Sequence, residues 1–137
     1  MENKKLYIEL VTPEKKLFSG YALSVWFPGS LSPFQVLPNH APIVSSLEAG
    51  LIKYLDEESK LNKLAITGGF VELKNNKVSV IIEKAMTKND LTLEKANSML
   101  DELKNKLSTA KTEEDKQKIK TELEFAKACL AVISDDY

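Results

Sequence analysis

Residues 34–44 read FQVLPNHAPIV, a stretch that places two prolines, an asparagine and a histidine between apolar residues. Pro38 and Pro42 fix the backbone φ angle and remove two amide donors, so neither an α-helix nor a central strand can run through it. Asn39 favours a turn, because its side chain bonds nearby backbone groups and tolerates left-handed φ angles. The stretch therefore predicts a rigid corner between two apolar arms.

His40, the only histidine, follows directly after this asparagine. It is open to two interpretations: a catalytic base, or a structural or contact residue of a stiff loop. An acid/base or nucleophilic site needs partner groups within reach, and none accompanies His40 locally in the sequence. We adopt the second interpretation, which agrees with the usual roles of polar groups in loops.

The length of 137 residues allows one hydrophobic core, or one core with a small appendage. The 19 basic side chains nearly balance the 20 acidic ones, which argues against nucleic-acid binding, where a basic surplus supplies much of the affinity. All 19 are lysines, so a nucleotide site would lack the planar, bidentate clamp that arginine provides.

Cys129 is the only cysteine, which excludes a disulfide within the chain and a cysteine zinc cluster and fits a reducing compartment. We expect it to be a small buried residue. No stretch approaches the roughly 20 apolar residues of a membrane span, and the first strand-like run alternates where a signal peptide would be continuously apolar. We expect a cytoplasmic protein, or one peripheral to something larger, without a span of its own.

Between residues 5 and 83 the hydrophobic period is two, which is typical of half-buried strands. One face of the strand expected near Trp26 comprises Leu23, Val25 and Phe27. The glycines at 68–69 indicate a bulge or tight turn where backbones pack closely, and the asparagines at 75–76 indicate a turn. Eight or more short strands with regular turns predict an antiparallel sandwich or barrel.

Beyond Ala85 the apolar residues recur every three or four positions, which places them on one stripe of a helix. The first stripe comprises Leu93, Ala96, Leu100, Leu103 and Leu107, and the second comprises Ile119, Leu123, Ala126, Leu130 and Ile133. Thr92 is the expected N-cap of the first helix, and Thr112 with Asp115 resembles a capping box. These stripes predict an antiparallel helical hairpin. Because each apolar stripe is narrow, we expect the hairpin to be held only modestly on the sandwich, as an arm that can dock or extend.

The sequence shows no catalytic, cofactor-binding or metal-binding constellation. Its histidine and its cysteine lie far apart, and the carboxylates at 56–58 and 135–136 have solvent-facing surroundings. This leaves binding, coupling or regulation as the expected function.

Several ordered motifs resemble the epsilon subunit of F-type ATP synthases, the counterpart of the mitochondrial delta subunit. The most specific motif is VLPNHAP at residues 36–42. Supporting motifs are FSG at 18–20, EAG at 48–50, ITGGFVE at 66–72 and NKV at 76–78. The resemblance spans essentially the whole chain.

The resemblance implies an all-β sandwich of about ten strands, residues 1–87, followed by an antiparallel α-helical hairpin, residues 88–137. The sandwich would bind the gamma subunit and the c-ring and catalyse nothing itself. It would couple ring rotation to the alpha/beta head, while the helical arm would be able to extend along gamma and restrain ATP hydrolysis. The implied location is the cytoplasmic face of the bacterial inner membrane, with a processed organelle protein as the alternative.

The resemblance also implies two sets of contact residues. The candidates for contact with the c-ring or gamma, expected together at the ring end, are Leu31, Phe34, Pro38, Asn39, His40 and Pro42. On the second helix, a stripe that would meet an acidic lever on the head comprises Lys116, Lys120 and Lys127. The alternative for this stripe is a solvated lysine face.

Two departures limit what the resemblance transfers. The run SPFQ at residues 32–35 lacks the acidic residue that often precedes the signature. In LTLEKA, residues 91–96, Thr92 and Lys95 stand where an ATP-binding motif has aspartate and arginine, so we expect weak or no ATP binding.

The alternative hypothesis for the whole chain is a free-standing β-sandwich that binds a ligand and is dimerised by its helical hairpin. Co-purification with a long coiled-coil partner and a membrane ring distinguishes the first hypothesis from this one.

Overall fold

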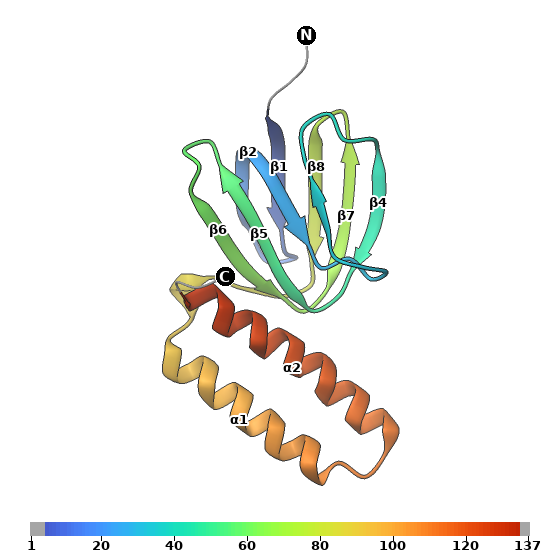
Figure 1. Cartoon of the computed structure of the whole chain (residues 1–137), viewed down its shortest axis with the longest axis vertical. Coiled ribbons are helices and arrows are strands. Elements are labelled where there is room, and N and C mark those ends of the chain that lie inside the picture. Colours follow the sequence, from blue (N-terminus) through green and yellow to red (C-terminus); the bar gives the residue numbers. More distant parts are fainter. Residues whose placement is uncertain (1–4, 135–137) are drawn as a thin grey trace.

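The computed structural model describes residues 5–134, which form a sandwich of strands and a pair of helices (Figure 1). The strands are β1 (Leu6–Val11), β2 (Lys16–Phe27), β3 (Phe34–Val36), β4 (Ile43–Leu47), β5 (Gly50–Asp56), β6 (Leu61–Ile66), β7 (Gly69–Lys74), β8 (Lys77–Ile82) and β9 (Ala85–Met86). The helices are the short 3-10 helix η1 (Lys88–Asp90), α1 (Leu93–Thr109) and α2 (Glu113–Ile133). The predicted fold class is confirmed, with nine strands in the described range where about ten were expected.

The strands lie in two layers joined by the long strand β2. β4, β7, β8 and β1 form one layer, and the hydrogen-bonded order continues through β2 into β5, β6 and β9, with β3 paired to the end of β2 (Figure 1). The first half of β2 pairs with β1, where Ala22 lies opposite Leu6, and the second half pairs with β5. β1 and β8 pair in parallel, with Tyr7 opposite Lys77, which brings the two ends of the sandwich sequence together.

The core between the layers is built from the inward positions of the alternating strands. Its fully buried larger side chains include Leu6, Ile8, Leu10, Val25, Phe27, Val71, Leu73, Val78 and Ile82. Burial of apolar surface is the main favourable contribution to folding, at about 25 cal/mol per Å². The buried members of this cluster all lie between residues 6 and 82, so the sandwich core is complete without the helices.

A β-bulge in β2 changes one predicted core position. The register between β2 and β5 shifts between Ala22 and Ser24, and Ala22 enters the core beside Val25 and Phe27. The prediction that Leu23 shares their face is wrong, because simple alternation assumes one uniform register along the strand.

The two predicted turns around β7 are confirmed. Asn75 and Asn76 have φ angles of 51° and 63°, the left-handed values of a two-residue hairpin turn between β7 and β8. At Gly69 a Cβ atom would clash with the carbonyl oxygen of Ile81, so the glycine allows two backbones to approach closely.

Helices α1 and α2 form the predicted antiparallel hairpin (Figure 1). The Thr92 hydroxyl accepts from the Lys95 amide at 3.1 Å, and the Thr112 hydroxyl accepts from the Asp115 amide at 3.1 Å, which confirms both predicted N-caps. The buried seam between the helices comprises Leu100, Leu123 and Ala126, with Met99, Leu103, Leu107, Ile119 and Leu130 partly buried beside it.

The hairpin docks through α2 onto the outer side of β5 and β6. A small second apolar cluster at this contact comprises Ala65, Leu91, Ala128, Cys129 and Val132. Lys63 of β6 adds a polar tie, because its Nζ donates to the carbonyl oxygens of Ala131 at 2.6 Å and Ser134 at 2.7 Å. Carbonyls at a helix C-terminus lack helical partners and favour a cation. The last turns of α2 therefore make much of the contact that keeps the hairpin docked on the sandwich.

Candidate functional site

The predicted corner at residues 38–42 is a turn held by its own backbone. Asn39 has a φ angle of 68°, the left-handed value expected of it. The His40 amide donates to the Leu37 carbonyl at 3.2 Å, and His40 Nδ1 donates to the Ala41 carbonyl at 2.7 Å. The imidazole thus helps to shape the loop, in agreement with a structural or contact residue.

The corner is also braced against the turn between β7 and β8. The Asn39 amide donates to Asn76 Oδ1, and Asn76 Nδ2 donates to Asn39 Oδ1 at 3.2 Å. Asn39, His40 and Pro42 are exposed, and Pro38 is half-buried. Three side chains are therefore presented to solvent from a rigid frame.

Leu31 is fully exposed on the loop between β2 and β3. Two hydrogen bonds hold this loop: the Ser30 amide donates to the Ser46 carbonyl at 3.1 Å, and Ser46 Oγ donates to Ser30 Oγ at 2.7 Å. The half-buried Phe34 packs its ring on Phe27, with centroids 5.5 Å apart. Phe34 thus supports the loop from below, and its contact with a partner stays a prediction.

The expectation that Leu31 and His40 lie together at one end is wrong. The loop of Leu31 is bonded to Ser46, near the end of β4, whereas the corner precedes the first residue of β4 and is braced at the β7–β8 turn. Because β4 runs between them, the two loops occupy opposite ends of the sandwich (Figure 1). A strand of this length spans roughly 15 Å. The contact candidates therefore form two groups.

The outer side of the β4–β7–β8–β1 layer carries exposed apolar side chains between these two loops. Val44, Phe70 and Ile81 are 66%, 53% and 63% exposed, and we call these three residues the apolar face. Phe70 lies directly opposite Ile81 on β8 and opposite Ser46 on β4. Val11 of β1 extends the row beyond Ile81. Contiguous exposed apolar residues of this kind mark interaction surfaces.

The two-residue period of the strands did not predict the apolar face. Each member stands at an outward position, next to residues that face the core, such as Val71 beside Phe70 and Ile82 beside Ile81. A two-residue period records the inward set and treats the outward one as polar by default. A search for large apolar residues in the outward phase would have found it.

The predicted lysine stripe lies on an exposed side of α2. Lys116 Nζ is 3.7 Å from Glu113 Oε1, and Lys127 Nζ is 3.4 Å from Glu124 Oε1. Lys120 and Lys127 also line a cleft of about 580 Å³ between α2 and the loop that joins β4 to β5. Exposed ion pairs of this kind contribute little, about 0–1 kcal/mol, so the lysines remain free to exchange partners.

The segment that resembles an ATP-binding motif, residues 91–96, forms the start of helix α1, and its side chains have structural roles there. The Thr92 hydroxyl is used as the N-cap, Lys95 Nζ donates to the Asp90 carbonyl at 3.4 Å, and Leu91 is buried in the second apolar cluster. Weak or absent ATP binding stays a prediction.

Cys129 is buried, as predicted, with its Sγ 3.9 Å from Met86 Sδ. Burial raises the pKa of its thiol from 9.0 to about 11.

Within residues 5–134, no three His, Cys, Asp or Glu side chains gather in a way that would hold a metal ion. In the same part of the chain, no helix is both long and apolar enough to cross a membrane.

Comparison with known proteins identifies the sandwich. The family of the ATP synthase delta/epsilon chain, beta-sandwich domain, matches residues 5–88. The ATP synthase epsilon chain of Leptospira interrogans (strain 56601) is 40% identical over 94 residues, which cover 69% of this chain and 73% of that one. The ATP synthase epsilon chain of Nitratidesulfovibrio vulgaris (strain DP4) is 33% identical over 129 residues, which cover 94% and 96%.

Solved structures share the fold along nearly the whole chain. A chain of the mitochondrial ATP synthase of Euglena gracilis superposes with a TM-score of 0.83 and 18% identity, covering 98% of this chain and 84% of that one. A chain of the central stalk and c-ring structure of the Tetrahymena thermophila mitochondrial ATP synthase gives 0.65 and 13%, covering 98% and 100%. At these identities the likeness concerns the fold alone.

Proposed function

Since the chain belongs to the family of ATP synthase delta/epsilon chains, we propose that it is a non-catalytic subunit of the central stalk. In this proposal the sandwich binds the gamma subunit and the c-ring and transmits rotation between the ring and the catalytic head. As part of the ATP synthase it would lie at the membrane as a peripheral subunit, on the cytoplasmic face of the inner membrane if the source is bacterial.

The apolar face is the observation that carries this proposal. Val44, Phe70 and Ile81 are more than half exposed on the outer side of the β4–β7–β8–β1 layer. Removing each of them from water on binding would contribute roughly 1–2 kcal/mol. A packed sandwich deforms little under load, because protein interiors have low compressibility. A face of this kind suits permanent attachment to a rotating partner, and we assign it to the gamma subunit.

The two exposed loops suit different neighbours, since they lie at opposite ends of the sandwich. Leu31 projects one apolar side chain beyond the end of β4, next to the apolar face through the Ser30–Ser46 bonds. The braced corner presents His40 at the other end. We propose that one loop contacts the c-ring and that the other contacts gamma.

The helical hairpin is the proposed regulatory arm, residues 88–137, attached to a sandwich of residues 1–87. Among the described residues, a small apolar cluster around Ala128 and Val132 and the polar tie made by Lys63 hold it on the sandwich. Undocking leaves the sandwich core intact, because the buried members of that core lie between residues 6 and 82. An extended arm would carry Lys116, Lys120 and Lys127 toward the alpha/beta head and restrain ATP hydrolysis there.

The role of the apolar face is tested by measuring the affinity of the full chain for the purified gamma subunit. Phe70→Thr combined with Ile81→Thr keeps β-forming residues but removes the apolar surface. We expect Kd to rise about 10- to 100-fold. Leu93→Thr is the matched control, because it removes an equally exposed apolar side chain (59%) from the arm. Equal affinities for the double variant and the control would contradict the assignment.

The role of the arm is tested by ATP hydrolysis of the assembled head with three forms of the chain. These are the full chain, a chain ending at Thr87, and the charge-reversed variant Lys116→Glu, Lys120→Glu and Lys127→Glu. We expect the last two to hydrolyse ATP faster than the first. Reversal of Lys104, Lys106 and Lys111 is the control with the same change in net charge. A rate that is identical for all forms would exclude an inhibitory arm.

A further inference from the structure

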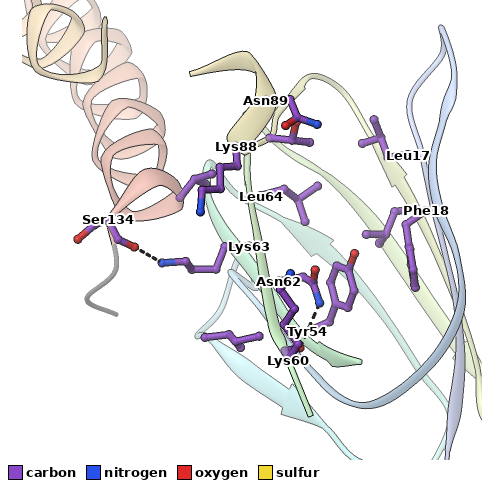
Figure 2. A pocket seen from close by; sticks show the side chains of 14 residues that line it. Leu17, Phe18, Tyr54, Lys60, Asn62, Lys63, Leu64, Lys88, Asn89 and Ser134 are labelled. Carbon is purple, nitrogen blue, oxygen red and sulfur yellow. Dashed lines mark hydrogen bonds between the residues drawn. The ribbon is translucent and has the colours of Figure 1, made fainter. Parts of the chain in front are cut away.

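A second concave site lies where the open edge of the sandwich meets the end of the arm. It is a cavity of about 360 Å³, lined by 14 residues from β1, β2, β5, β6, the turn between β5 and β6, the segment 87–89 and the end of α2 (Figure 2). Small-molecule sites occupy roughly 300–1,000 Å³, so its size is at the lower end of that range.

The floor of the cavity is apolar. Leu10 and Leu64 belong to the sandwich core, and the half-buried Leu17 and Phe18 pack against that core. The Phe18 ring lies against Tyr54, with centroids 4.7 Å apart. A purely hydrophilic ion would leave the apolar floor exposed to water, whereas a ligand with an apolar body of a few carbon atoms would cover it.

The rim of the cavity is cationic. Lys60, Lys63 and Lys88 line it, and within the described range none of the 14 lining residues is Asp or Glu, although the whole chain has more acidic than basic side chains. Lys63 is engaged, since its ammonium donates to the Ser134 carbonyl at the end of α2 (Figure 2) and also to the Ala131 carbonyl.

Lys60 and Lys88 are the available cations of this rim. Neither ammonium makes a hydrogen bond or an ion pair to the other residues that the structure describes. The charge of Lys60 acts on the Asp56 carboxylate, but the oxygens of Asp56 already accept from the Glu58 and Lys60 amides and from Asn62 Nδ2. The ammonium of Lys60 therefore stays available to an incoming anion.

Neutral donors complete the rim. Tyr54 and Asn89 both line the cavity. Burial raises the pKa of Tyr54, with a smaller contribution from the charge of Asp56, so its hydroxyl keeps its proton at neutral pH and can donate. Cationic and neutral donors above an apolar floor match one chemistry: a single anionic head group on an apolar body.

We propose that this cavity binds a small carboxylate with an apolar body, its head group held by Lys60 and Lys88 and its body resting on Leu17, Phe18 and Leu64. The walls come from both the sandwich and the arm, since Val132 and Ser134 of the arm line the cavity beside Thr87 and Asn89. A ligand that touches both parts binds the docked form better than the extended one and shifts the equilibrium toward it. This consequence extends the proposed function of the arm, but the binding itself needs only the isolated chain.

The binding is tested by NMR titration of the ¹⁵N-labelled full chain. The probes are octanoate and 3-phenylpropionate, an aliphatic and an aromatic carboxylate, together with 1-octanol and inorganic phosphate. We expect both carboxylates to shift the amides of residues 60–64 and 87–89. We also expect them to bind about tenfold more tightly than 1-octanol, because a charged hydrogen bond is lost in the alcohol. The stronger carboxylate identifies the kind of body that the floor prefers.

Two variants attribute the preference to the rim. Lys60→Met combined with Lys88→Met should abolish the advantage of octanoate over 1-octanol, whereas Lys74→Met with Lys104→Met, which removes the same charge elsewhere, should keep it. In wild type, saturating octanoate should also slow amide exchange in residues 126–133 of α2.

Three results would overturn the proposal: equal affinity for octanoate and 1-octanol, the same amide shifts with phosphate alone, or no shifts in these segments up to the solubility limit of the carboxylates. None of them depends on the gamma subunit or on ATP hydrolysis. A failure here therefore leaves the proposed function in place, and a failure of the gamma-binding test leaves this site in place.

Discussion

Lys63 connects two parts of the molecule that touch over a small area. Its Nζ lies within 2.7 Å of two backbone carbonyls at the end of α2, and both partners are about 70 residues away in the chain. A charged donor there both satisfies carbonyls that lack helical partners and complements the helix dipole. We expect one residue of this kind to have a measurable effect on how firmly the arm is docked.

Lys63→Met keeps most of the aliphatic stem and removes the charge. We expect the docking of α2 to weaken by roughly 1–2 kcal/mol, as for a hydrogen bond to a charged group. Hydrogen exchange of the amides at 126–133 should accelerate about tenfold, whereas the amides of the β-sheet should be unaffected. Lys74→Met, on an exposed position of β7, is the control. Unchanged exchange in α2 would show that the apolar cluster alone holds the arm.

Cys129 makes stability depend on pH in the alkaline range. The unfolded chain ionises its thiol near pH 9, whereas the folded chain keeps the proton until its pKa of about 11. The folded state therefore binds more protons in this window, and the contribution to stability is full below pH 9 and is lost as the pH rises toward 11. We expect urea unfolding to show a steeper loss for wild type than for Cys129→Ala between these values. Parallel pH profiles would contradict the assigned burial of the thiol.

Residue properties that depend on chain neighbours were predictable, and those that depend on distant partners were not. The left-handed φ of Asn39 and the turn at Asn75 and Asn76 follow from local composition, and both are confirmed. The tie of Lys63 and the pairing of Asn39 with Asn76 join residues 37 to 71 positions apart. No local pattern distinguishes Lys63 from the other lysines, so its role emerged only from the fold.

Among the elements, the strands and helices with a clear period were predictable, and errors arose where pairing changes within a strand. In β2 the bulge at Ala22–Ser24 exchanges Leu23 for Ala22 in the core. The apolar face was overlooked for a related reason. The two-residue period gives the phase of each strand, but it does not say that Phe70 and Ile81 become direct neighbours across two strands.

The β7–β8 turn offers a test of how elements brace one another. Asn76→Gly preserves the left-handed φ but deletes the hydrogen bonds to Asn39, so the free energy of unfolding should fall by about 1 kcal/mol. Asn75→Gly also suits the turn and leaves the brace intact, so it should change stability by less than about 0.5 kcal/mol. Denaturant unfolding compares the two. Equal effects would mean that the brace contributes nothing.

At the scale of the whole molecule, the order of sandwich and hairpin followed from the change of hydrophobic period near Ala85. The relative placement of the two candidate loops did not. That placement depends on the direction of β4 between them, which the resemblance and the period leave undetermined. The candidate site is therefore the part least accessible to sequence reasoning: the residues were named, but their grouping required the sheet.

Affinity for ATP concerns the whole chain, because the segment at residues 91–96 lies where the sandwich sequence passes into the arm. Thr92 serves as an N-cap, and Lys95 contacts a backbone carbonyl, in a chain without arginine. Calorimetric titration of the full chain should therefore give weak or undetectable binding of ATP. Thr92→Asp with Lys95→Arg, which keeps a capping side chain, tests whether the two positions limit affinity. Tight, stoichiometric binding to the unaltered chain would contradict this expectation.

The parallel pairing of β1 with β8 limits when the sandwich can fold during synthesis. β1 is the first strand to leave the ribosome, yet its partner on one side begins at Lys77. Contacts of such long sequence separation close late and slow folding. The nascent chain must keep one edge of β1 unpaired until more than half of the protein has been synthesised, and the arm follows only afterwards. A ribosome-bound chain stalled before β8 has emerged from the exit tunnel should therefore be protease-sensitive throughout. A chain stalled after Ile82 has emerged should already contain a protease-resistant sandwich.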